Sequence, residues 1–146
     1  MENAFHIHIS SIQSQNHYPR NKWDDFTVDL GEYIQLTDKY DWECSLEDIT
    51  CQLKGKSKSQ NILVECDLCD VSHVYGRNFA LLRKIKNGRA LSRSMFIPIR
   101  RKTFQNIHFH LLSHTFSKLN IEYTRCSLYF RPIIHQYESR NLHTQS

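Results

Sequence analysis

The stretch Trp42-Glu43-Cys44-Ser45-Leu46-Glu47 alternates apolar and polar side chains at every second position. Successive side chains of a β-strand point to opposite faces of a sheet, so this spacing is typical of a strand with one face on a core. Similar segments lie, in chain order, at residues 5–10, 26–30, 62–68, 107–111 and 126–130, with weaker ones at 79–85 and 95–100. The sequence therefore predicts eight short strands.

The apolar members of these strands form the predicted core. They are Phe5, Ile7, Ile9, Phe26, Val28, Leu30, Trp42, Cys44, Leu46, Ile62, Val64, Cys66, Ile107, Phe109, Leu111, Leu128 and Phe130.

Glycine and proline separate the strands. Gly31, Gly55, Gly76 and Gly88 all fall between predicted strands, whereas Pro98 interrupts one, which indicates an edge or bulged strand. Short helical turns are expected only within residues 33–40 or 77–86. Eight strands in about 130 residues predict an all-β, antiparallel sandwich, and we expect a single jelly roll because immunoglobulin-like folds use seven or nine strands.

The jelly-roll domain is expected to cover residues 1–131, and the polar residues 132–146 to form a flexible C-terminal arm. With 146 residues, 40% of them hydrophobic, and a formal net charge of +4, the chain is typical of one globular domain. Its longest apolar run, residues 79–82, is far shorter than the roughly 20 residues of a membrane span. The first residues carry no secretory signal, so we expect a protein that is not secreted and has no membrane partner.

Nine histidines include two His-x-His pairs, His6 with His8 and His108 with His110. Such a pair, with a carboxylate and a third histidine, would bind iron or manganese in a cupin-like barrel. Both pairs lie opposite the predicted core positions, and no glutamate follows six residues after either one. The pattern favours solvent-facing or interface histidines, so no metal and no cofactor are expected.

The five cysteines are predicted to be reduced, because five is an odd number and the chain is not expected to be secreted. Cys66-Asp-Leu-Cys69 followed by His73 has the spacing of zinc ligands, but no second Cys-x-x-Cys completes a set of four. Residues three apart on a strand point to opposite faces. We therefore expect Cys66 in the core and Cys69 at the strand's end, with diverging sulfur atoms.

No pattern indicates catalysis. A Gly-x-Ser-x-Gly elbow and a glycine-rich phosphate loop are both absent from the sequence. The adjacent acidic pairs at 24–25 and 47–48 would point to opposite faces of their strands. The chain is therefore not expected to be an enzyme.

Charge is segregated along the sequence. Residues 77–102 hold nine basic residues and no acidic one, and residues 24–48 hold nine acidic residues against Lys39. Two oppositely charged sides would favour head-to-tail association in a closed ring, and the basic side could instead neutralise nucleic-acid phosphates, while solvated surface charge is the third interpretation. The basic set is Arg77, Arg83, Lys84, Lys86, Arg89, Arg93, Arg100, Arg101 and Lys102. The acidic set is Asp24, Asp25, Asp29, Glu32, Asp38, Asp41, Glu43, Glu47 and Asp48.

Three stretches resemble a known family. They are His17-Tyr18-Pro19-Arg20-Asn21, Phe26-Thr27-Val28-Asp29-Leu30 and Trp42-Glu43-Cys44-Ser45-Leu46-Glu47-Asp48-Ile49. They are similar to the amino-terminal half of the minor capsid proteins of polinton (Maverick) elements and their adintovirus relatives, with Cys44, Ser45 and Asp48 departing from the usual residues. Ile107-His108-Phe109-His110-Leu111 and Leu128-Tyr129-Phe130-Arg131 resemble the closing strands of the same family.

The resemblance implies a structural virion protein, in which a single jelly roll forms the homopentameric penton at the vertices of an icosahedral capsid. Its partners would then be further copies of itself, the major capsid protein of the same particle and, without sequence specificity, packaged DNA. Two alternatives stay open: a capsid cement protein of the same fold, and a nucleic-acid-associated structural protein that uses the basic segment 77–102.

Overall fold

The computed structural model describes residues 3–13, 15–54, 61–86 and 93–134, which contain ten β-strands and no helix. Consequently no helix in these ranges could span a membrane. The strands are β1 (Phe5–Ser10), β2 (Asp25–Gln35), β3 (Trp42–Leu53), β4 (Asn61–Cys66), β5 (Ser72–Val74), β6 (Arg77–Phe79), β7 (Leu81–Lys86), β8 (Phe96–Pro98), β9 (Thr103–Ser113) and β10 (Ile121–Pro132).

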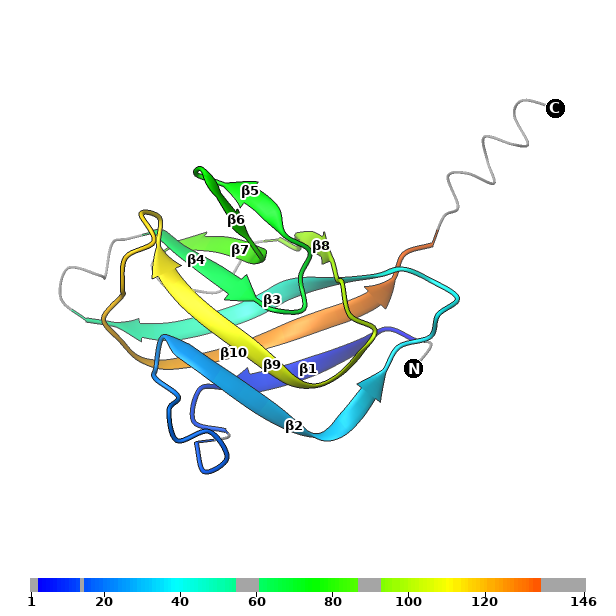
Figure 1. Ribbon diagram of the computed structural model, residues 1–146, viewed down its shortest axis with the longest axis horizontal. Coiled ribbons are helices and arrows are strands. Elements are labelled where there is room, and N and C mark those ends of the chain that lie inside the picture. Colours follow the sequence, from blue (N-terminus) through cyan, green and yellow to red (C-terminus); the bar gives the residue numbers. More distant parts are fainter. Residues whose placement is uncertain (1–2, 14, 55–60, 87–92, 135–146) are drawn as a thin grey trace.

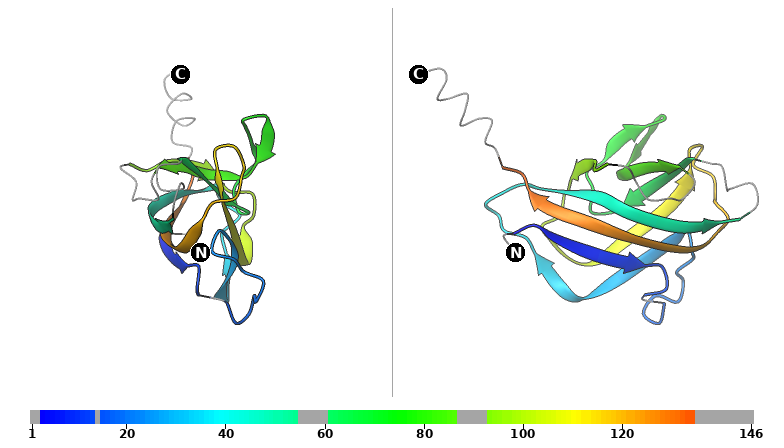
Figure 2. Two further views of the ribbon diagram at one scale, coloured as in Figure 1. Left: turned by 90° about the vertical axis from the view of Figure 1, so that its left-hand side faces the viewer. Right: turned by 180° about the vertical axis from the view of Figure 1, so that it is seen from behind.

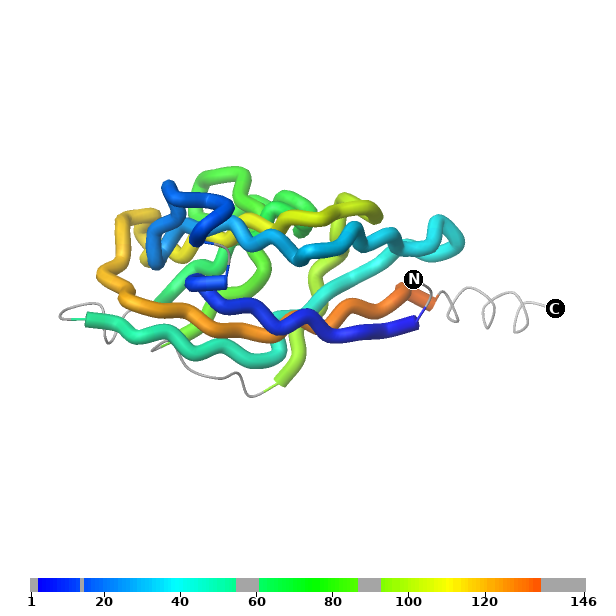
Figure 3. Tube along the Cα trace, turned by 90° about the horizontal axis from the view of Figure 1, so that it is seen from below, coloured from blue at the N-terminus to red at the C-terminus, as the bar shows by residue number. Residues whose placement is uncertain are grey.

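Eight of these strands form two four-stranded antiparallel sheets that face each other, as Figures 1 and 3 show. The first sheet has the order β1-β10-β3-β8, and the second sheet has the order β2-β9-β4-β7. The predicted all-β antiparallel sandwich is confirmed. Strands β1 to β4 alternate between the sheets, so consecutive strands meet through the core rather than as hairpins.

The core fills the space between the two sheets. Its largest buried side chains are Trp42 on β3, Phe26 on β2, Phe109 on β9 and Phe130 on β10. The rings of Phe104 and Phe130, from opposite sheets, have centroids 5.9 Å apart. Removing one such ring costs about 3–5 kcal/mol, so these contacts hold the layers together.

Most of the predicted core is buried. The buried members are Ile9, Phe26, Val28, Trp42, Cys44, Leu46, Ile62, Val64, Cys66, Ile107, Phe109, Leu111, Leu128 and Phe130. Phe5, Ile7 and Leu30 are only partly buried and pack against this core. Phe5 and Ile7 lie on an outer strand, where each has a neighbouring strand on one side only.

The segment 79–85 is two strands rather than one. Residues before Ala80 belong to β6, which pairs with β5 in a separate two-stranded hairpin that projects from the sandwich (Figure 2). Tyr75 and Gly76 form its turn with positive φ angles of 46° and 85°, the conformation that two-residue hairpin turns need. The expectation of short helical turns at 33–40 and 77–86 is wrong. β2 extends to Gln35, β6 and β7 cover nearly all of 77–86, and neither range contains a helix.

The expectation that every glycine separates two strands is wrong for Gly31, which lies inside β2. The register between β2 and β9 shifts between Asp29 and Ile34, which marks a bulge. Gly31 adopts a φ of +77°, and its N–H donates to Asp29 Oδ1 at 2.8 Å. Gly55 and Gly88 lie outside the described residues.

Two further expectations concern the strand that contains Pro98 and the C-terminal end of the domain. β8 is an outer strand that ends at Pro98, so the predicted edge position is confirmed. β10 continues to Pro132, and the Ile133 N–H donates to the Asp41 carbonyl at 2.7 Å. Pro132 and Ile133 therefore belong to the folded domain, although the sequence placed them in the arm. Residues 135–146 of the predicted arm lie outside the described residues.

Candidate functional site

The outer face of the second sheet carries a chain of imidazole and carboxylate groups. Strand alternation places Ile107 and Phe109 of β9 in the core, so His108 and His110 project from the opposite face. The register sets His110 between Asp25 on β2 and Glu65 on β4. This row therefore joins three neighbouring strands on the surface.

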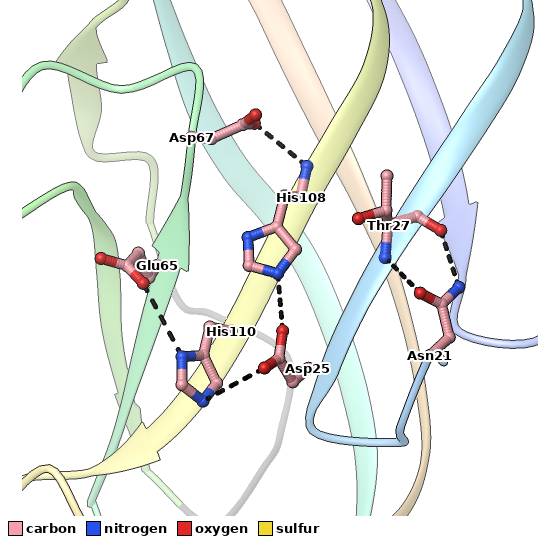
Figure 4. Close-up of polar contacts among 7 residues, drawn as sticks. All are labelled: Asn21, Asp25, Thr27, Glu65, Asp67, His108 and His110. Atoms are coloured by element: carbon pink, nitrogen blue, oxygen red, sulfur yellow. Dashed lines mark hydrogen bonds and ion pairs between the residues drawn. The ribbon is translucent and has the colours of Figure 1, made fainter. Parts of the chain in front are cut away.

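Asp25 contacts both histidines, as Figure 4 shows. Its Oδ1 lies 2.6 Å from His108 Nε2, and its Oδ2 lies 4.0 Å from His110 Nε2. On the other side, His110 Nδ1 lies 3.8 Å from Glu65 Oε1. Each imidazole thus has a carboxylate neighbour.

Asp67 extends this network to the loop between β8 and β9. Its Oδ1 accepts the backbone N–H of His108 at 3.0 Å, and its Oδ2 accepts Arg101 Nη2 at 2.9 Å. Arg100 Nε donates to the Asp67 carbonyl at 3.0 Å. The turn after β4 is therefore attached both to β9 and to the loop that precedes it.

A groove of about 830 Å³ is lined by the loop of residues 17–22 together with Asp25, Thr27 and His108. The Asn21 side chain holds this loop, because its Oδ1 accepts the Thr27 N–H at 2.9 Å and its Nδ2 donates to the Thr27 carbonyl at 2.8 Å (Figure 4). The Tyr18 hydroxyl donates to Asn106 Oδ1 at 2.9 Å. The loop is thus fixed to both β2 and β9.

The two His-x-His pairs do not converge on a common point. His108 and His110 have ring centroids 6.5 Å apart, and His6 and His8 on β1 have centroids 6.3 Å apart. Both pairs lie on outward faces, His6 and His8 being exposed. Among the described residues, no group of three or more His, Cys, Asp or Glu side chains could hold a metal ion.

The histidine network consists of contacts between imidazole and carboxylate groups. A hydrogen bond joins His108 to Asp25, and His110 lies 4.0 Å from Asp25 and 3.8 Å from Glu65. Within the described ranges, neither ring is hydrogen-bonded to a serine, threonine or cysteine. An imidazole base that activates a nucleophile needs such a contact.

The expectation that the Cys66 and Cys69 sulfur atoms diverge is wrong. β4 ends at Cys66 and the chain turns, with the Cys69 N–H donating to the Cys66 carbonyl at 3.1 Å. The turn directs both thiols into the core, where Cys69 contacts the thiols of Cys66 and Cys44. Burial raises the pKa of the Cys66 thiol, and the hydrogen bond with Cys44, together with burial, raises that of Cys69.

All five cysteines are buried and free. Burial raises the pKa of Cys51 to about 11 and raises that of Cys126 further. Because the thiolate is the reactive form, these side chains act as small apolar groups in the folded protein.

Most residues of the predicted basic set contact other residues of the same chain. Arg83 is buried, with 8% of its surface exposed, and its Nη1 donates to the Leu46 carbonyl at 3.5 Å. Arg77 lies over the Phe116 ring at 4.4 Å, and Lys84 Nζ donates to the Tyr75 hydroxyl at 2.9 Å. Lys102 lies 3.9 Å from Asp41. Lys86 and Arg93 are exposed, and Arg89 lies outside the described residues.

The residues of the predicted acidic set also differ in their exposure and in their contacts. Asp24 is buried, with 5% exposed, so its side chain offers little surface to a partner. Glu43 pairs with Arg131 at 3.2 Å, and Ser94 Oγ donates to Glu47 Oε2 at 2.7 Å. Glu32, Asp38, Asp41 and Asp48 are exposed, while Asp25 and Asp29 are intermediate. The two charged sets therefore touch at Asp41 and Lys102 instead of occupying wholly separate sides.

Sequence reasoning missed the loop of residues 17–23 as a candidate site. The signal was present, because the aromatic residues Tyr18 and Trp23 flank the cations Arg20 and Lys22 within seven residues. It also missed Asp25 as the partner of His108, since those residues are far apart in the chain and only the pairing of β2 with β9 joins them.

In comparisons with known proteins, no family model matches the sequence and no curated protein matches it.

Proposed function

We propose that this chain is a structural virion protein: a single jelly roll that forms the penton of an icosahedral capsid as a homopentamer. The observation that carries the proposal is the order of the eight sandwich strands. In that order β1, β3, β8 and β10 make one sheet, and β2, β4, β7 and β9 make the other. This order supports an eight-stranded jelly roll, an architecture that is common among capsid subunits.

Fold alone does not decide function, so a second feature is needed. β2 and β7 are the two outer strands of the second sheet, and they carry opposite charge. β2 has Asp25, Asp29 and Glu32, whereas β7 has Lys84 and Lys86 on its surface. Copies placed side by side would bring an acidic edge against a basic edge, which is what a closed head-to-tail ring requires.

Burial of apolar loops and strand faces would supply most of the binding energy in such a ring, because exposed ion pairs contribute only about 0–1 kcal/mol each. The exposed apolar residues Ile12, Tyr33, Val71, Tyr75 and Met95 are available for this role. In a particle, the partners would be other copies of this chain, the major capsid protein and packaged DNA, and the location would be the capsid vertex.

The proposal is tested by measuring the mass of the purified full-length chain and imaging it by electron microscopy. We expect rings of five subunits at low salt and, in a parent particle, density for this chain at the fivefold vertices. A chain that stays monomeric at high concentration and lies between major capsomers would instead be a cement protein. A monomer that binds DNA through residues 77–102 and never enters a particle would favour the nucleic-acid-associated alternative.

A further inference from the structure

The loop between β1 and β2 presents cations without acidic partners. Arg20 and Lys22 are exposed, and Lys118 lies beside Lys22 at a second hollow. No acidic residue occurs from Asn3 to Trp23. Within the described part of the chain, no ion pair joins any of these three cations to a carboxylate.

This differs from the basic segment 77–102, whose cations are mostly engaged. Arg101 pairs with Asp67 at 2.9 Å, Arg83 is buried, and Lys102 lies near Asp41. A cation that is already paired gains less from a phosphate, because it must lose its first partner. The loop before β2 is therefore the better place for phosphate contacts.

Aromatic side chains accompany the loop cations. Trp23 is 39% exposed, although tryptophan is usually well buried, and Tyr18 is partly exposed. Tyr18 lines the groove of about 830 Å³, and Trp23 lines a neighbouring hollow of about 400 Å³. Asn21 and Lys22 line both, so the loop separates two adjoining hollows, each with one aromatic ring.

Two carboxylates lie near the loop. Asp24 is buried, and Asp25 lines the groove with His108 Nε2 at 2.6 Å from its Oδ1, on the side away from Trp23 and Lys118 in the second hollow. The loop is also fixed before any ligand binds, through Asn21 to Thr27, Tyr18 to Asn106 and the backbone bond from Lys22 N–H to the Asp25 carbonyl at 2.8 Å. A fixed loop loses little conformational entropy on binding.

We propose that residues 17–23, with Lys118, form a binding site for single-stranded nucleic acid. Arg20, Lys22 and Lys118 contact backbone phosphates, while bases stack on Trp23 and Tyr18 in the two hollows. This combination of a cationic track and aromatic platforms is how proteins bind single strands without sequence preference. The groove shares Asp25 and Thr27 of β2 with the ring interface proposed above. The phosphate and stacking contacts come from residues outside β2 and β7, so they do not depend on that interface.

The test uses the full chain and a fluorescent thymidine oligonucleotide of about 20 nucleotides, longer than one site. Binding is followed by fluorescence anisotropy at low and moderate salt. Trp23→Ala is expected to weaken binding by about 10-fold, as loss of one stacking platform does. Arg20→Gln and Lys22→Gln are each expected to weaken binding and to lower the slope of log affinity against log salt by about 1.

Lys39→Gln is the matched control, because it removes one exposed cation from the β2–β3 loop, at the opposite end of the sandwich from the loop before β2 (Figure 1). It is expected to change neither the affinity nor the salt slope measurably. Equal losses for Lys39→Gln and Arg20→Gln would mean that only net charge matters, and the proposed site would be wrong.

Tryptophan fluorescence gives a second readout. The chain has two tryptophans, and Trp42 is only 1% exposed, so quenching by the oligonucleotide reports on Trp23. Trp23→Phe is expected to keep most of the affinity and to lose the quenching. Unquenched Trp23 in the wild-type complex would overturn the stacking contact.

Two other ligands separate stacking from simple charge attraction. A duplex of the same length and polyglutamate are both expected to bind at least about 10-fold more weakly than the single strand, because neither offers free base faces. Equal binding of either would overturn the assignment. The mass of the assembly is measured in the same samples. Monomers that bind the oligonucleotide would contradict the penton but not this site. Rings that do not bind the oligonucleotide would contradict this site but not the penton.

Discussion

At the scale of single residues, the buried thiols make the protein sensitive to alkaline pH. A thiol is neutral when protonated, so burial favours its protonated form and raises its pKa. The pKa of Cys51 rises from 9.0 to about 11. In the unfolded chain the same thiol loses its proton near pH 9, so the unfolded state is favoured progressively above that pH.

We therefore predict that the free energy of unfolding falls between pH 9 and about 11, with a contribution of about 3 kcal/mol from Cys51 alone. The stabilisation is fully present below the unfolded pKa and is lost as pH approaches the folded pKa. Urea unfolding in a reducing buffer measures it. Cys51→Ala should lower the free energy of unfolding at neutral pH. Between pH 9 and 11 it should reduce the slope of that free energy against pH by the equivalent of about one proton. Equal slopes for the variant and the wild-type protein would show that Cys51 does not contribute.

Asp25 illustrates how one residue can serve two purposes. Its carboxylate holds His108 on the outer face of β9, and its backbone carbonyl holds Lys22 in the loop. The histidine network and the loop before β2 are thus parts of one connected surface.

At the scale of elements, the outer strands carry features that limit unspecific pairing with other chains. β8 is three residues long and ends in proline, and β7 carries Lys84 and Lys86. β2 has its bulge at Gly31, and the Asn21 side chain covers the backbone of Thr27. Short strands, lysines, bulges and covered edges are the usual protections of sheet edges.

Gly31 and Gly76 both have positive φ angles, and an added methyl group would meet nothing within 4 Å at either site. Substitution by alanine therefore tests backbone strain alone, which is about 1–2 kcal/mol. We predict that Gly31→Ala lowers the global free energy of unfolding by about 1 kcal/mol, since β2 is part of the sandwich.

Gly76→Ala should have a smaller global effect, because the β5–β6 hairpin lies outside both four-stranded sheets and can open locally. Hydrogen exchange should show the change confined to β5 and β6, and urea unfolding should show the difference between the two variants. A larger global loss for Gly76→Ala than for Gly31→Ala would mean that the hairpin supports the sandwich.

At the scale of the whole molecule, the charge pattern is more mixed than the order of residues along the chain indicates. The β8–β9 loop brings Lys102 near Asp41 of the β2–β3 loop, so basic and acidic residues meet at one end of the sandwich. The separation that remains is across the second sheet, between its acidic edge strand β2 and its basic edge strand β7.

If this separation directs assembly, the association of subunits should weaken as salt rises toward moderate ionic strength, where the Debye length is about 8 Å. We predict that Lys84→Glu with Lys86→Glu lowers the association constant by at least about 10-fold at low salt. Adding Glu32→Lys to that variant should recover part of the loss. Sedimentation over a salt series measures this, and unchanged association of the reversed variant would exclude the contact between β2 and β7.

The sequence by itself determined the all-β class, most of the core positions and the outward direction of the histidine pairs. These follow from side-chain alternation, which is a local property of an extended chain. Alternation says nothing about which strands become neighbours. Only the tertiary structure therefore decided that Asp25 meets His108, that Cys44, Cys66 and Cys69 converge, and that Arg83 is buried, because each contact joins residues that lie apart in the chain or depends on a turn after a strand.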